Sequence, residues 1–164
     1  MKRIGVTGHR DIPEAAYEHV RAALEAALKA ALCAGHGGAL EAYSSLAAGA
    51  DQLFADIALD CGAELTVVIP SGDYEDAFEA PAELARYRVL RGRATREVRM
   101  EFAHSTDEAY MAAGTYIADH CDALLAVWDG EPARGLGGTG DIVRYARERG
   151  RPVTVIWRAG VRRS

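Results

Sequence analysis

A glycine-rich segment in the last third of the chain has the composition of a phosphate-binding turn. It reads Gly137-Gly138-Thr139-Gly140 and is followed by a helical pattern. Glycine lets backbone N–H groups approach an anion closely, and the start of a helix adds positive potential. The alternative interpretation is a tight strand-to-helix turn that needs a positive φ. The segment is neither a Walker A motif, since no Gly-Lys-Ser/Thr follows, nor a dinucleotide fingerprint, which should follow the first strand.

The segment Gly8-His9-Arg10 stands where a dinucleotide fingerprint would be expected, directly after the first apolar run. A guanidinium group can bind a phosphate through two parallel hydrogen bonds. The alternative is that Arg10 only bonds a backbone carbonyl or pairs with Asp11. We therefore treat Arg10 as a candidate phosphate ligand, and His9 as weaker support.

Three aspartates are candidate ligand or acid groups. Asp51 and Asp141 each lie early in an expected helix, and Asp129 follows an apolar run and precedes Gly130. A carboxylate in the first turn of a helix stabilises the helix by itself, so that interpretation stays open for Asp51 and Asp141. In a ligand site the same groups would hold ribose hydroxyls or a base edge, or act as an acid.

Strands and helices are expected to alternate along the chain. Short apolar runs predict strands at 3–7, 40–44, 65–69, 123–128 and 152–157, and strict alternation predicts a half-exposed edge strand at 97–102. Helices are expected between them, with residues 71–80 forming a loop and a capping box at 105–108 starting the helix that runs to about residue 121. The pattern predicts a single domain over 1–164, with a Rossmann-like three-layer α/β/α fold and a mainly parallel sheet.

Polar and small residues follow the expected strands and not the opposite strand ends. In an open parallel sheet, ligands bind outside the carboxyl ends of the strands. The candidate ligand-binding residues are therefore Gly8, His9, Arg10, Ser45, Gly49, Asp51, Pro70, Asp129, Gly130, Gly137, Gly138, Thr139, Gly140 and Asp141.

The composition of the chain limits the kinds of partner that we expect. The formal net charge is −5, so we do not expect nucleic acid as a partner, because nucleic-acid-binding domains are usually basic. No signal peptide or membrane-spanning stretch is visible, which predicts a cytoplasmic protein with no membrane partner. The three cysteines match no zinc pattern, and we expect neither a metal nor a cofactor. An arginine-rich segment at 86–99 offers a solvated surface or a subunit contact, so a homodimer is a candidate assembly.

Four segments together resemble the SLOG superfamily, which includes the Lonely-Guy phosphoribohydrolases, proteins of the DNA-processing-protein-A type and nucleotide-sensing modules. They are GVTGHR at 5–10, SSLAAGAD at 44–51, DALLAVWDG at 122–130 and GGTGD at 137–141. The resemblance implies a Rossmann-like fold and a nucleotide-type ligand. The Lonely-Guy signature is Pro-Gly-Gly-x-Gly-Thr-x-x-Glu. Here the leading proline is absent, the threonine is shifted, and Val143 or Arg144 stands where the catalytic glutamate would be.

Three functions follow as hypotheses. The first is a sensor or binding module for a nucleotide or nucleotide-derived small molecule, as in stand-alone SLOG members. The second is a nucleotide N-glycosidase-type enzyme, with Asp51, Asp129 or Asp141 as candidate acids that stabilise an oxocarbenium-like transition state. The third is an interaction subunit whose pocket no longer binds a ligand.

Overall fold

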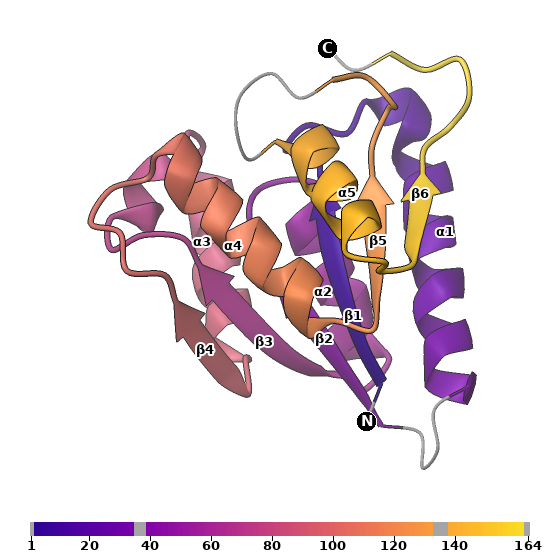
Figure 1. Cartoon of the computed structure of the whole chain (residues 1–164), viewed down its shortest axis with the longest axis horizontal. Coiled ribbons are helices and arrows are strands. Elements are labelled where there is room, and N and C mark those ends of the chain that lie inside the picture. Colours follow the sequence, from indigo (N-terminus) through magenta and orange to yellow (C-terminus); the bar gives the residue numbers. More distant parts are fainter. Residues whose placement is uncertain (1, 35–38, 133–137, 163–164) are drawn as a thin grey trace.

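The computed structural model describes residues 2–34, 39–132 and 138–162. They form one six-stranded parallel sheet in the order β4-β3-β2-β1-β5-β6, which confirms the predicted Rossmann-like α/β fold (Figure 1). The strands are β1 Lys2–Gly8, β2 Leu40–Ser44, β3 Glu64–Ile69, β4 Arg96–Arg99, β5 Ala123–Val127 and β6 Val153–Ile156. The helices are α1 Glu14–Ala34, α2 Ala50–Asp60, the short 3₁₀ helix η2 Tyr74–Ala77, α3 Pro81–Gly92, α4 Asp107–His120 and α5 Thr139–Glu148.

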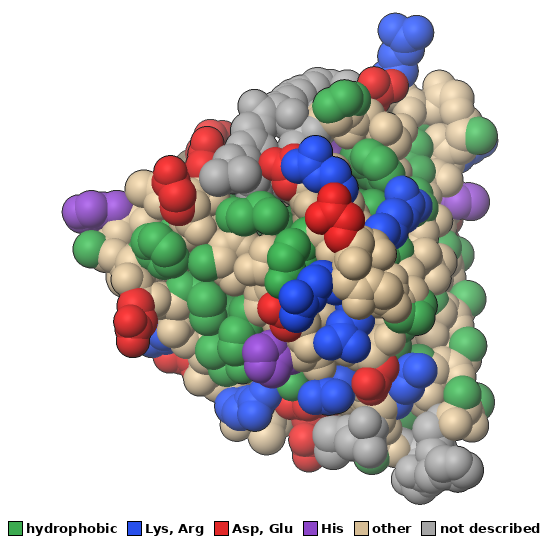
Figure 2. All heavy atoms as spheres, in the orientation of Figure 1, with side chains coloured by type: hydrophobic (Ala, Val, Ile, Leu, Met, Phe, Trp, Pro, Cys, Tyr) green, Lys and Arg blue, Asp and Glu red, His purple; other side chains and the backbone are tan. Residues whose placement is uncertain are grey.

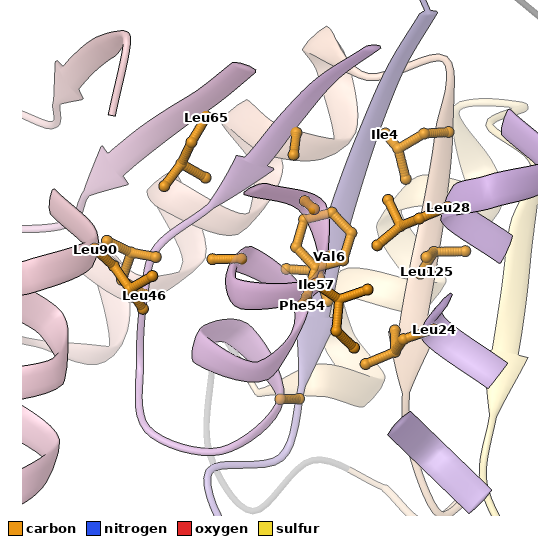
Figure 3. Close-up of a cluster of buried hydrophobic side chains, with 14 of the residues drawn as sticks. Ile4, Val6, Leu24, Leu28, Leu46, Phe54, Ile57, Leu65, Leu90 and Leu125 are labelled. Atoms are coloured by element: carbon orange, nitrogen blue, oxygen red, sulfur yellow. The ribbon is translucent and has the colours of Figure 1, made fainter. Parts of the chain in front are cut away.

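Helices cover both faces of the sheet because consecutive strand residues point to opposite sides. In β3, Val67 packs with α1, α2 and α3 in one buried cluster, whereas Val68 packs with α4 and α5 in the other. The larger cluster is centred on Phe54, with Leu24 and Leu28 of α1 beside it (Figure 3). Burial on both faces explains why the strand sequences are continuous apolar runs.

The first strand lies in the middle of the sheet. The chain passes outward from β1 through β2 and β3 to β4, then returns to place β5 on the other side of β1. The strand order therefore reverses between β1 and β5. A crevice at the carboxyl ends of such a strand pair is the usual ligand position in open α/β sheets.

Three local features differ from the sequence-based expectations. The edge strand ends at Arg99 and not at residue 102, because its neighbour β3 ends at Ile69 and Pro70 follows. The expected loop at 71–80 contains η2. Thr106 caps α4 through a bond from the Ala109 N–H (3.2 Å), one residue later than the predicted cap.

None of the helices in the described part of the chain combines the length and apolar character that crossing a membrane requires.

Candidate ligand-binding site

The ends of β1 and β5 are joined at the reversal point by His9 and Asp129. His9 is buried at 4% exposure and its ring packs edge-on against Trp157. The Asp129 amide donates to His9 Nε2 at 3.1 Å, and Asp129 Oδ1 lies 3.2 Å from the same nitrogen. A neutral ring accepts the amide proton, whereas a protonated ring donates to the carboxylate. Both residues were predicted site residues, and their contact holds the end of β1 against the end of β5.

Gly8 and Gly49 allow β1 and α2 to pack closely. A β-carbon on Gly8 would lie 2.4 Å from the Ala50 β-carbon and 2.9 Å from that of Val127. Gly49 precedes α2 with a φ of 81°, and the next amide, of Ala50, donates to the His9 carbonyl (3.1 Å). These glycines are needed for packing, which positions the site without requiring that they contact a ligand.

Arg10 follows this junction and lies exposed at the rim. Its guanidinium carbon lies 4.8 Å from the centre of the Tyr110 ring in α4. Among the described residues it forms no ion pair with a carboxylate, so the suggested pairing with Asp11 is absent. Burial lowers the pKa of Arg10, but Tyr110, Tyr74 and Asp51 outweigh that effect and raise it. The group is therefore a permanent cation held by an aromatic ring.

Asp51 lies in the first turn of α2, 8% exposed. Burial raises the pKa of its carboxyl to about 7, against the opposing effects of the Ala47 N–H and the Arg10 charge. Oδ2 accepts the Ala47 N–H at 3.4 Å, and the other oxygen has no hydrogen-bond partner in the described part of the chain. A carboxyl that titrates near neutrality can donate or accept a proton, as acid–base groups do.

A pocket of about 410 Å³ opens beside Arg10. We call it the Arg10 pocket. Its walls come from the loops after β1 and β2, from η2 and from the start of α3. They include Arg10, Ala47, Ala48, Tyr74, Phe78 and Glu83.

Tyr74 lines the Arg10 pocket and packs against a group of aromatic side chains. Its side chain is 3% exposed, and its ring contacts Phe78, Tyr87 and Tyr110 edge-on at centroid distances of 5.3 to 6.5 Å. Burial raises its pKa well above the usual value, so the hydroxyl stays neutral. Tyr74 was not among the predicted site residues, although it closely follows β3 and the strand-end rule could have included it.

The glycine-rich segment is described from Gly138 onward, and Gly137 lies outside the described residues. Gly138 precedes α5, Thr139 is buried at the first position and Gly140 is half-buried. Asp141 Oδ1 accepts a bond from Arg144 Nη2 at 3.3 Å. This helix start lies at the same sheet edge as the other loops, because α5 follows the carboxyl end of β5 (Figure 1).

The remaining predicted residues lie on this edge but outside the Arg10 pocket. Ser45 is half-buried after β2, Pro70 is buried after β3, and Gly130 is exposed after β5 with a φ of 86°. Within the described ranges, no three His, Cys, Asp or Glu side chains are grouped as metal ligands would be.

The chain resembles several solved structures. DNA processing protein A from Streptococcus pneumoniae matches with a TM-score of 0.68 and 20% identity, over 94% of this chain and 50% of that one. The Helicobacter pylori protein, described with its single-stranded DNA binding mode, matches with a TM-score of 0.63 and 16% identity, over 94% and 64%. The protein TM1055 matches with a TM-score of 0.56 and 15% identity, over 93% and 72%.

These similarities show the fold: the chain has the Rossmann-like fold that its sequence predicted, shared with the DNA processing protein A structures and TM1055. It spans less than two thirds of either DNA processing protein A chain. No protein-family model and no curated protein matches the sequence.

The expectation that nucleic acid is not a partner is contradicted by the Helicobacter pylori protein of similar fold, which binds single-stranded DNA. The expectation was wrong because it used the net charge of the chain, which does not show where positively charged side chains are clustered on the surface. On the face shown in Figure 2, many Lys and Arg side chains lie over and below α5. This helix and the residues after it supply Arg144, Arg147, Arg149 and Arg151.

Proposed function

We propose that this chain binds a nucleotide or nucleotide-derived ligand in the Arg10 pocket and acts as a sensor or ligand-binding module. The observation that carries the proposal is Arg10 itself. It is a cation without an ion-pair partner among the described residues, at a pocket lined by aromatic side chains. A guanidinium in this position suits a phosphate group.

The pocket also has the size and surface that a small ligand requires. Its volume of about 410 Å³ falls in the range of small-molecule sites. Phe78 and Tyr74 offer an aromatic wall for a base, and the Tyr110 ring holds the guanidinium in place.

The test measures thermal stability and calorimetric affinity with a panel of AMP, GMP, ADP-ribose and NAD. Ligand should raise the melting temperature of the wild type and of Arg144→Ala, which removes a matched exposed arginine from α5. Arg10→Ala should remain folded by circular dichroism and lose at least about tenfold in affinity, the effect of removing a charged hydrogen-bond partner. Unchanged affinity in Arg10→Ala would remove this assignment.

The same mixtures test the enzymatic alternative by chromatography, because an N-glycosidase releases free base. Asp51 is the favoured acid: Asp129 contacts His9 and Asp141 pairs with Arg144, whereas one Asp51 oxygen has no partner in the described part. Base release that is lost in Asp51→Asn would support catalysis. Binding without release supports the sensor, and absence of both across the panel favours an interaction subunit.

A second candidate function is binding of single-stranded DNA, favoured by the fold likeness to the Helicobacter pylori protein and by the arginines around α5. Fluorescence anisotropy of a labelled oligothymidine would measure it. Phosphate contacts should make the affinity fall steeply with salt. Arg147→Ala should weaken binding of this oligonucleotide and leave mononucleotide binding in the Arg10 pocket unchanged.

A further inference from the structure

We propose that the Arg10 pocket selects a guanine base, with Glu83 accepting from the base and Tyr74 donating to it. This inference rests on the proposed nucleotide binding and specifies its substrate class. The observation behind it is that two polar side chains without hydrogen-bond partners among the described residues line the same pocket, one an acceptor and one a donor.

Glu83 is held in place by its backbone. Gln52 Nε2 donates to the carbonyl of Leu46 at 3.2 Å and to the carbonyl of Glu83 at 3.0 Å. One buried amide therefore ties the first turn of α3 to the loop after β2. The Glu83 side chain is half-buried, and in the described part of the chain its carboxylate forms no ion pair or hydrogen bond. A ligand with two adjacent N–H donors would give this carboxylate the hydrogen-bond partners that it lacks.

Tyr74 supplies the complementary donor. Its hydroxyl has no hydrogen-bond partner within the described residues, and although the residue as a whole is only 3% exposed, the oxygen is not among the buried side-chain atoms left without a partner, so solvent reaches it. A hydroxyl that solvent reaches on a pocket wall is available to donate to an acceptor on a ligand. The aromatic contacts with Phe78 and Tyr87 fix the ring, so the hydroxyl cannot turn away to find a partner elsewhere.

The balance of donors and acceptors on the pocket wall identifies the base. Three carboxylates, those of Asp11, Glu79 and Glu83, line the pocket together with one cation, Arg10. The edge of the ligand that faces Glu83 must therefore donate hydrogen bonds. Guanine presents N1–H and the 2-amino group side by side, with the O6 acceptor next to them. Adenine presents one amino group between two ring-nitrogen acceptors, which a carboxylate would repel.

The charged residues that line the pocket also predict how a nucleotide would be oriented in it. The carboxylates of Asp11, Glu79 and Glu83 repel a phosphate and the Arg10 guanidinium attracts it, so the phosphate should lie against Arg10. The base then lies toward η2 and α3, where Phe78 offers a ring to pack against. The charges of the lining residues thus orient the ligand.

The experiment compares calorimetric affinities for GMP, IMP and AMP on the full chain. IMP lacks only the 2-amino group of GMP, so it isolates one donor. We expect GMP to bind at least about tenfold more tightly than IMP, the usual effect of a hydrogen bond to a charged group. Equal affinities for the three nucleotides would overturn guanine selection and leave the proposed nucleotide binding intact. Absence of binding by all three would overturn guanine selection, and absence of binding by ADP-ribose and NAD as well would overturn the proposed nucleotide binding.

Two variants separate the roles of the side chains. Glu83→Gln places an amide donor against the 2-amino group, so the GMP-to-IMP affinity ratio should fall to about 1. Tyr74→Phe removes the donor to O6, which GMP and IMP share, so both should weaken about equally and keep their ratio. Glu148→Gln, at the end of α5, is the control for loss of one negative charge. A ratio unchanged in Glu83→Gln would overturn the role of Glu83.

Discussion

The β-carbon of any residue other than glycine at position 49 would lie 2.4 Å from the carbonyl oxygen of Arg10. Gly49 also has a φ of 81°, in the region that side chains disfavour. The backbone that carries the Arg10 side chain is thus packed against a glycine that follows it after one helix and one strand, α1 and β2. Changes at Gly49 should act on the site through Arg10.

Gly49→Ala should therefore lower both stability and nucleotide affinity. We expect a loss of about 2 to 4 kcal/mol, combining the unfavourable φ with the steric overlap. Urea unfolding and calorimetry measure the two effects. Gly62→Ala is the matched control, because Gly62 has a φ of 85° but no atom within 4 Å of the added carbon. Equal losses in the two variants would mean that the contact with Arg10 contributes nothing.

Asp51 should make the protein less stable as pH rises. Its pKa is about 7 in the folded chain, compared with an ordinary value of 3.8. Between these values the unfolded state loses its proton while the folded state keeps it, so the free energy of unfolding falls as pH increases. Below pH 3.8 both states are protonated, and above about 7 the penalty is complete, at most about 4 kcal/mol.

Unfolding of the wild type and Asp51→Asn between pH 4 and 8 measures this effect. The stability of the Asn variant relative to the wild type should increase through that range and level off above pH 7. Asp60→Asn, exposed at the other end of α2, controls for the loss of one carboxylate. A pH-independent difference for Asp51→Asn would contradict the prediction.

Asp129→Ala should destabilise the junction between β1 and β5. It removes a carboxylate that lies 3.2 Å from a buried imidazole, that of His9. The expected cost is about 1 to 3 kcal/mol in chemical unfolding, because a buried polar group loses a partner. Asp122→Ala, at the more exposed residue before β5, should cost less, since water can replace its bond from the Arg3 amide.

Gly114→Ala should disturb the contact between α4 and α5. The new β-carbon would lie 2.3 Å from Ile142 Cδ1. Overpacking of this kind costs about 1 to 3 kcal/mol. Ile142→Val deletes the overlapping methyl, so the double variant should lose less than the sum of the single changes in a double-mutant cycle. Additive losses would show that α5 moves freely to make room.

The alternation of apolar runs and helical periods was sufficient to predict the fold class, because buried strands and amphipathic helices each carry a local pattern. The strand order was not predictable. Ile4 pairs with Ala123, and no local signal specifies that pairing. The length of the edge strand also escaped prediction, because the end of β4 is set by its neighbour at Pro70 and not by its own alternation.

At the candidate site, the strand-end rule predicted Arg10 and Asp51 but did not predict the residues on the opposite wall of the Arg10 pocket. Glu83 has the pattern of an acidic residue in the first turn of a helix, and Tyr110 that of a helix face packed on the core. Their relation to Arg10 arises only when α3 and α4 pack at the sheet edge. Gly8 was predicted as a ligand contact, and the structure gives it a packing role, since glycine serves close approach to protein and to ligand alike.

The central place of β1 has a kinetic consequence. Its hydrogen bonds to β2 can form early, but those to β5 join residues more than a hundred positions apart in sequence. Such distant contacts slow folding, because a large loop must close before they form. During synthesis, β1 therefore presents an unsatisfied apolar edge until residue 127 has emerged, and this interval is when the chain is most exposed to aggregation.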